Sequence, residues 1–136
     1  MDAMTRSELA KKCGVNIETL RYYEKRKLLG PPPRSESGYR LYSEEDAVKI
    51  RFIKNAQKLG FTLREIGDLL KLRVRQGAPS ESVLIRVQKK LEEIEKKIHD
   101  LRSIKKTLQI LAGRCQAEGP TSVCPILASF ESNRGV

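Results

Sequence analysis

Apolar residues recur most regularly in the second half of the chain, from residue 81 to residue 112. The steps between them alternate between three and four residues, with one irregular step at Ile104, which is the heptad pattern of a helix with one apolar face. The positions are Leu84, Val87, Leu91, Ile94, Ile98, Leu101, Ile104, Leu108 and Leu111. No Pro or Gly interrupts them before Gly113, so the pattern predicts one helix roughly 48 Å long.

A helix with one narrow apolar face needs a partner that covers this face. No other segment of the chain has a comparable length, so the pattern favours a second copy of the chain and a homodimeric coiled coil. The alternative is a helix that packs against its own domain.

Shorter patterns before residue 30 predict two helices joined by a turn. Thr5 and Glu8 have the spacing of a capping box, and Gly14 is placed to end the first helix. Asn16 is placed to cap a second helix that runs from residue 17 to about residue 27, which together predicts a helix-turn-helix. The polar face of the second helix is expected to meet the major groove or its flanking phosphates through Asn16, Thr19, Arg21, Tyr22 and Lys25.

Residues 34–42 follow three consecutive prolines and predict a small hairpin, here called the wing. Ser37 and Gly38 are turn residues, and the flanks can pair. The wing carries Arg34, Tyr39 and Arg40, whose guanidinium and phenol groups suit contacts with the sugar-phosphate backbone.

Two further helices are predicted after the wing, starting at Ser43 and at the capping-box spacing of Thr62 and Glu65. The apolar face expected for the first comprises Ala47, Val48, Ile50, Phe52, Ile53 and Ala56. The polar faces carry Arg51, Lys54, Lys58 and Arg64. These four side chains are expected to be solvated, with a second phosphate-contacting patch as the alternative.

The segment after the long helix contains two thiols, Cys115 and Cys124, at the ends of a loop with a short helix after it. Two thiolates at this spacing suit a thiophilic ion such as Hg(II), Cu(I), Ag(I), Au(I), Zn(II) or Cd(II). A redox pair that forms a disulfide has the same spacing. The third cysteine, Cys13, is expected to be a small buried residue, and His99, the only histidine, is expected to be solvated.

Charge and composition agree with a DNA-binding region at the start of the chain. The 136 residues carry a formal net charge of +10, and residues 1–75 contain 17 Lys and Arg against 10 Asp and Glu. A basic N-terminal region suits a polyanion such as nucleic acid. The odd cysteine count argues against a disulfide framework, and no segment resembles a membrane span or a signal peptide, so we expect a cytoplasmic protein.

Five features of the sequence together point to a known family: TLRYYE at 19–24, RSESGYRLY at 34–42, LGFTLREI at 59–66, the long helix and the Cys115 to Cys124 loop. In these features the chain resembles the MerR family of transcription regulators. It implies a mainly α fold with a winged helix-turn-helix DNA-binding domain (1–75), an antiparallel dimerisation coiled coil (80–112) and a metal-binding loop with a C-terminal helix (113–136). It further implies a homodimer on a promoter operator that distorts the DNA when a metal binds, so that RNA polymerase can use the promoter.

The resemblance gives two indications about the metal. The loop is most similar to that of the mercury-responsive members, which implies Hg(II) held by Cys115 and Cys124. Those members have a third cysteine, donated by the other subunit, where this chain has Ser80. A serine there resembles the sensors of monovalent Cu(I), Ag(I) and Au(I), although Ser80 also suits the N-cap of the long helix. No grouping typical of an enzyme occurs, and the segment after the long helix is too short to enclose a drug.

Overall fold

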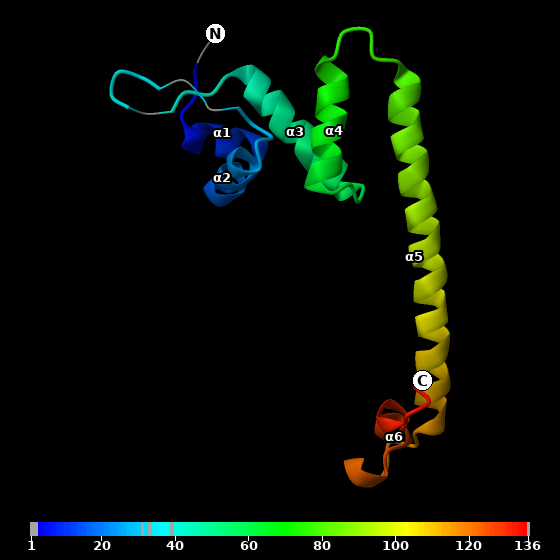
Figure 1. Ribbon diagram of the computed structural model, residues 1–136. Coiled ribbons are helices and arrows are strands. Elements are labelled where there is room, and N and C mark those ends of the chain that lie inside the picture. Colours follow the sequence, from blue (N-terminus) through cyan, green and yellow to red (C-terminus); the bar gives the residue numbers. More distant parts are fainter. Residues whose placement is uncertain (1–2, 31, 33, 39, 136) are drawn as a thin grey trace. The chain divides into compact units, whose positions relative to one another are not determined.

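The computed structural model describes residues 3–30, 32, 34–38 and 40–135, and it is mainly helical (Figure 1). Among these residues there are six α-helices and one short 3-10 helix, with no strand longer than an isolated bridge. The chain divides into two units, Met1–Ile85 and Arg86–Val136, here called the head and the tail unit. None of the described helices has the length and apolar content needed to cross a membrane.

The first two helices of the head are α1 (Arg6–Cys13) and α2 (Ile17–Lys25). The capping box predicted for Thr5 and Glu8 is present, and Gly14 ends α1 with a φ of 66°, a left-handed conformation that glycine adopts at little cost. Asn16 caps α2. The helix α2 ends two residues earlier than the apolar pattern predicts, and Lys27 there has a φ of 61°.

The next two helices are α3 (Glu44–Lys58) and α4 (Leu63–Val74), each opened by a capping box. Ser43 pairs with Asp46 at the start of α3, and Thr62 pairs with Glu65 at the start of α4. The apolar face predicted for α3 is wrong at one position, because Val48 is 54% exposed.

The core of the head lies where α1 packs against α2 and α3, and where α4 packs against α3. Burial of these apolar side chains is the main force that holds the head together. The expectation that Cys13 is buried is confirmed. The core consists of Leu9, Ala10, Cys13, Leu20, Tyr23, Leu29, Tyr42, Ala47, Ile50, Ile53, Ala56 and Ile66.

The long helix α5 spans Ser80–Arg114, two residues beyond the predicted end. It begins at Ser80 itself, so the expectation that Ser80 stands before the helix as its N-cap is wrong. Most of the apolar positions of the predicted face are open, with Leu101 64% and Leu91 53% exposed. His99 is exposed, as predicted.

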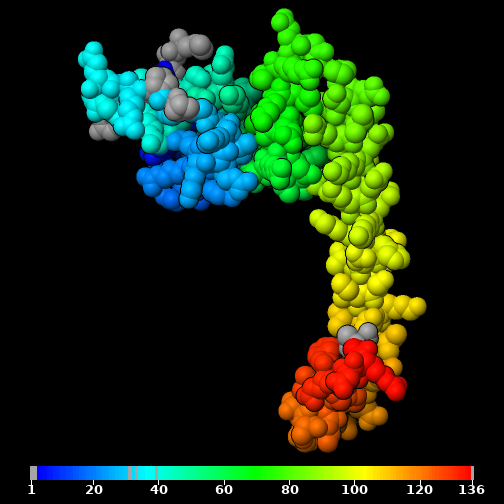
Figure 2. Space-filling model, viewed as in Figure 1, coloured from blue at the N-terminus to red at the C-terminus, as the bar shows by residue number. Residues whose placement is uncertain are grey.

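The tail unit ends in a compact loop and helix at the end of α5, as Figure 2 shows in orange and red. A 3-10 turn, η1 (Thr121–Val123), precedes α6 (Pro125–Glu131). Leu111, close to the end of α5, is only 4% exposed.

Candidate nucleic-acid interface and metal site

Two of the residues predicted to contact DNA, Asn16 and Thr19, lie at the start of α2 and form hydrogen bonds with each other. Asn16 Oδ1 accepts a hydrogen bond from the Thr19 backbone N–H at 2.7 Å and one from the Thr19 hydroxyl at 2.8 Å. This is an N-cap contact, and it fixes both side chains at the beginning of the helix. The two residues therefore shape the end of α2 that a DNA-reading helix would present to a groove.

The remaining predicted residues of α2 lie on its exposed side. Arg21 forms an ion pair with Glu18 at 2.9 Å, with the Arg21 side chain 57% exposed. Tyr22 is 47% exposed, and its hydroxyl accepts a hydrogen bond from Arg26 at 3.2 Å. Lys25 is exposed as well. Arg21, Tyr22 and Lys25 are thus available to a ligand outside the protein, as the sequence predicts.

Glu24 is the residue of α2 that sequence reasoning missed. Its carboxylate forms ion pairs with Arg6 at 3.3 Å and with Arg40 at 2.7 Å, and it accepts a hydrogen bond from the Tyr42 hydroxyl. Arg6 Nε also donates to the Tyr42 oxygen at 3.3 Å. The sequence gives no signal for this cluster because its members come from three separate segments.

The cluster changes the ionisation of two of its members. The hydrogen bond with Tyr42, helped by the charge of Glu24, raises the pKa of the Arg6 guanidinium. Burial raises the pKa of the Tyr42 phenol, and the hydrogen bond to Glu24 raises it further. Tyr42 therefore stays protonated and remains a donor to the carboxylate.

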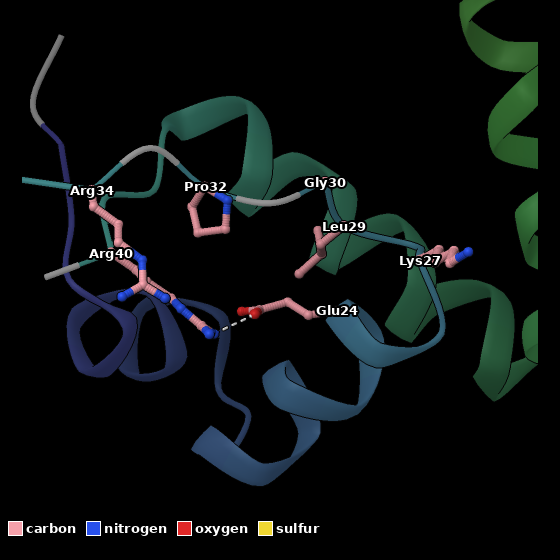
Figure 3. A pocket seen from close by; sticks show the side chains of 7 residues that line it. All are labelled: Glu24, Lys27, Leu29, Gly30, Pro32, Arg34 and Arg40. Carbon is pink, nitrogen blue, oxygen red and sulfur yellow. Dashed lines mark hydrogen bonds and ion pairs between the residues drawn. The ribbon is translucent and has the colours of Figure 1, made fainter. Parts of the chain in front are cut away.

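One backbone bridge closes the wing on itself, and a second joins it to the start of the chain. Backbone bridges join Arg34 to Arg40 and Met4 to Tyr42, and the Gly38 N–H closes a turn on the Ser35 carbonyl at 2.9 Å. Arg34 and Arg40 line a surface hollow of about 460 Å³ together with Glu24, and Figure 3 shows the Arg40 guanidinium directed at the Glu24 carboxylate. Tyr39, the third predicted wing contact, lies outside the described residues.

The basic side chains of α3 and α4, which were expected to be solvated, partly bind groups inside the protein. Lys54 Nζ donates to the carbonyl of Cys13 at 2.8 Å and to that of Gly14 at 3.3 Å, which satisfies the end of α1. Arg51 pairs with Glu44 at 3.5 Å. Lys58 and Arg64 are exposed, which agrees with a solvated face.

The candidate metal ligands lie at the two ends of the loop in the tail unit. Cys115 directly follows α5, and its sulfur accepts a hydrogen bond from the Ala117 N–H at 3.4 Å. Cys124 is the residue before α6, with Pro125 as the first residue of the helix. Both thiols are free and only partly buried, so an ion can reach them.

The Cys124 sulfur has surroundings that favour a thiolate. The backbone N–H groups of Leu127 and Ile126 lower the pKa of this thiol, and a hydrogen bond with the Cys115 side chain lowers it further. Because thiolates are the form that binds thiophilic ions, the two ends of the loop together suit a soft cation.

The donor set that the described residues offer is two sulfurs. No group of three or more His, Cys, Asp or Glu side chains suited to one ion occurs in the described part of the chain. Two thiolates match ions that accept two sulfur ligands, such as Hg(II) and Cu(I). Cys13 belongs to the core of the head, where burial raises its pKa, so it has the opposite chemistry.

A wing tied to the head beside a helix that exposes Arg21, Tyr22 and Lys25 is the arrangement of a winged helix-turn-helix DNA-binding regulator. Two family models match the chain: one described as MerR HTH family regulatory protein over residues 4–72, and one described as MerR, DNA binding, over residues 47–111. The chain belongs to the MerR family of helix-turn-helix transcription regulators.

Three relatives illustrate the similarity. The chain is 44% identical over 123 residues to the mercuric resistance operon regulatory protein of Bacillus cereus, which covers 90% of this chain and 93% of that protein. The structure of the regulator PbrR691 from Ralstonia metallidurans CH34 in complex with lead(II) matches with a TM-score of 0.85 at 33% identity, over 93% of this chain and 98% of that one. MerR of Bacillus megaterium MB1 in complex with mercury(II) matches with a TM-score of 0.70 at 39% identity, over 90% and 95%.

Proposed function

We propose that this regulator responds to a thiophilic metal ion, and that the ion is Hg(II), as in mercury resistance. The observation that carries the proposal is the pair of free thiols at the ends of one loop, with the Cys124 pKa lowered by backbone amides and by Cys115. Cys115 and Cys124 would bind the ion as thiolates from one subunit. The relatives described with mercury support Hg(II).

A sensor of monovalent Cu(I), Ag(I) or Au(I) is the second candidate, and one observation favours it. Ser80 stands where a third thiolate would be expected, and a monovalent ion is satisfied by two thiolates. Under both candidates Ser80 of the partner subunit would lie over the loop. The relative described with lead(II) adds another divalent thiophilic ion to the comparison.

The chain would act as a homodimer on promoter DNA. The open apolar face of α5 supports pairing with a second copy, since a single helix leaves Leu91, Ile98 and Leu101 in water. Two heads would then bind the two halves of an operator through α2 and the wing. Metal binding would favour a distorted promoter that RNA polymerase can use, with protein–DNA contacts offsetting the cost of deforming the duplex.

A titration under reducing conditions, followed by native mass spectrometry, tests the metal assignment. The protein would be titrated separately with Hg(II), Cu(I), Pb(II) and Zn(II), and we expect one Hg(II) per loop at the lowest free concentration. Cys115→Ser and Cys124→Ser should each abolish this binding, whereas the matched control Cys13→Ser should retain it. Retention of tight Hg(II) binding in both loop variants would contradict the proposal.

Replacement of Ser80 by cysteine distinguishes the two candidate ions. Ser80→Cys should add a third thiolate and raise the affinity for Hg(II) sharply, with little change for Ag(I). Metal-dependent transcription from a promoter bound by the protein provides the second measurement. If Cu(I) or Ag(I) activates the unmodified protein while Ser80→Cys leaves Hg(II) binding unchanged, the monovalent sensor is correct.

A further inference from the structure

Glu24 occupies a position in the head where three segments meet. It belongs to α2, and its partners come from the start of α1 (Arg6) and from the end of the wing (Arg40 and Tyr42). Only 14% of its side chain is exposed, so these contacts replace the water that a carboxylate otherwise binds. Hydrogen bonds that involve charged groups are stronger than neutral ones, so these contacts hold the three segments together. We call Glu24 and its three partners the joint.

The joint determines where the wing lies relative to α2. Tyr42 is 2% exposed and is tied to Met4 by paired backbone hydrogen bonds of 2.8 and 2.7 Å. Its hydroxyl donates to Glu24, so one end of the wing is connected to α2 through a buried side chain. Arg40 makes the second connection, and Figure 3 shows it reaching Glu24 across the hollow.

The charge of Glu24 is unfavourable for a polyanionic ligand. Glu24 also lines a second surface hollow, whose other lining side chains are all cationic: Arg6, Arg21, Lys25 and Arg40. A carboxylate within this group weakens the local attraction for phosphates. Electrostatics alone therefore predicts that removal of the Glu24 charge makes DNA bind more tightly.

We propose that Glu24 is a positioning residue for operator binding, which holds the wing against α2 so that both engage one operator half as a unit. The inference rests on the proposed DNA binding, which it deepens. If Glu24 positions the wing, removal of its charge should weaken binding to operator DNA. If the charge acts only by electrostatics, its removal should strengthen binding. Glu24→Gln keeps the size of the side chain and removes only its charge, so the sign of the effect on specific binding distinguishes them.

The experiment compares Glu24→Gln with Glu18→Gln in the full-length protein. Glu18 lies on the same helix and pairs with Arg21, so its replacement adds the same charge without touching the joint. Binding would be measured at several salt concentrations to a duplex that the wild-type protein selects from a randomised library, and to a scrambled duplex of equal length. Hydroxyl-radical footprints on the selected duplex would report the wing and α2 contacts separately.

We expect Glu24→Gln to bind the selected duplex roughly tenfold more weakly, while binding to the scrambled duplex stays equal or becomes tighter. The slope of log affinity against log salt concentration for the selected duplex should decrease by an amount that corresponds to about one phosphate contact per subunit. The DNA protected from hydroxyl radicals by the wing should become accessible. The α2 protection should remain. Glu18→Gln should bind both duplexes at least as tightly as the wild type does.

If Glu24→Gln behaves like Glu18→Gln, the positioning role is wrong, although DNA binding by the wild type still stands. If the wild type selects no duplex, the proposed DNA binding itself fails. Should Glu24→Gln not fold, Tyr42→Phe tests the same joint, because it removes one donor and leaves the charge unchanged. Loss of the wing footprint in Tyr42→Phe supports the proposal, and an unchanged footprint overturns it.

Discussion

The head and the tail unit bury apolar surface in different ways. The head encloses a core in which Leu9, Leu20, Ile50, Ile53 and Ile66 have no exposed surface. In the tail unit, Leu111 is the one buried apolar residue among those described, and the remaining apolar face of α5 is open. Both regions have a periodic pattern of apolar residues in the sequence. Only in the head are the resulting apolar faces covered by other helices of the same chain.

This difference shows what an apolar pattern specifies. The pattern determines which face of a helix avoids water, but it does not say which chain covers that face. In the head, short helices and tight turns bring several faces together. The helix α5, most of which lies in the tail unit, has 35 residues and no intramolecular partner of its length among the described elements. The proposed second copy follows from that mismatch.

The largest effect is expected from a charge on the open face of α5. Ile98→Asp should prevent dimer formation, because burial of an unpaired carboxylate in an apolar contact is costly. Sedimentation of the full-length protein provides the measurement. Ser103→Asp adds the same charge on the opposite side of the helix and should leave the dimer intact. A dimer of unchanged affinity in Ile98→Asp would remove the basis for the contrast between the two regions.

Shortening a core side chain of the head should have a smaller effect, which lowers the stability of the fold and leaves dimer formation unchanged. Ile50→Ala removes a side chain with no exposed surface and should lower the free energy of unfolding by about 2–5 kcal/mol. Val48→Ala, two residues earlier on the same helix, alters a side chain that is 54% exposed and should change it by less than about 0.5 kcal/mol. Equal losses in denaturant titrations would show that the head core is not as tightly closed as described.

The cysteines extend the comparison to chemistry. Burial raises the pKa of Cys13 in the head, whereas the backbone amides of Leu127 and Ile126 lower that of Cys124 in the tail unit. Since the thiolate is the reactive form, Cys124 should react with iodoacetamide at lower pH than an ordinary thiol, and Cys13 should react slowly throughout. Peptide mapping across a pH series measures both. The difference should disappear in denaturant, and its persistence there would contradict the structural cause.

The smallest effect concerns backbone strain, which each region has at one described non-glycine residue. Lys27 in the head has a φ of 61°, and Ala117 in the tail unit has a φ of 59°. Lys27→Gly should stabilise the head by about 1 kcal/mol, because glycine adopts this conformation without a steric penalty. Ala117→Gly should leave unfolding of the head unchanged. Thermal unfolding followed by circular dichroism distinguishes the two variants. A lower melting temperature for Lys27→Gly would contradict the claim that the backbone is strained at Lys27.

The features that sequence predicts well are local ones. The capping boxes at Thr5 and Thr62, the stop at Gly14 and the cap at Asn16 each involve residues within a few positions of each other, and the structure confirms all of them. Their hydrogen bonds depend on spacing along the chain, which the sequence displays directly. The family resemblance was likewise carried by short contiguous segments, and the family models confirm it.

The features that sequence misses depend on residues far apart along the chain. Lys54 was expected on a solvated or phosphate-contacting face, but it binds carbonyl groups at the end of α1, about forty positions earlier. Arg40 pairs with Glu24, and the sequence did not predict this partner on α2. Such contacts depend on how helices pack, and no local spacing encodes them. The contact of Arg40 with phosphates stays a prediction. The roles of Ser80, Cys115 and Cys124 in metal binding stay predictions.

If the open face of α5 pairs with a second copy as proposed, the stability of the protein depends on its abundance. Under the proposed pairing, the fraction of chains with a covered face rises with total concentration and falls on dilution, by mass action. A regulator present in few copies per cell would need a dimer dissociation constant below its own concentration. In such a dimer the exposed apolar positions from Leu84 to Leu108 would largely set that constant, and with it the lowest copy number at which the regulator stays assembled.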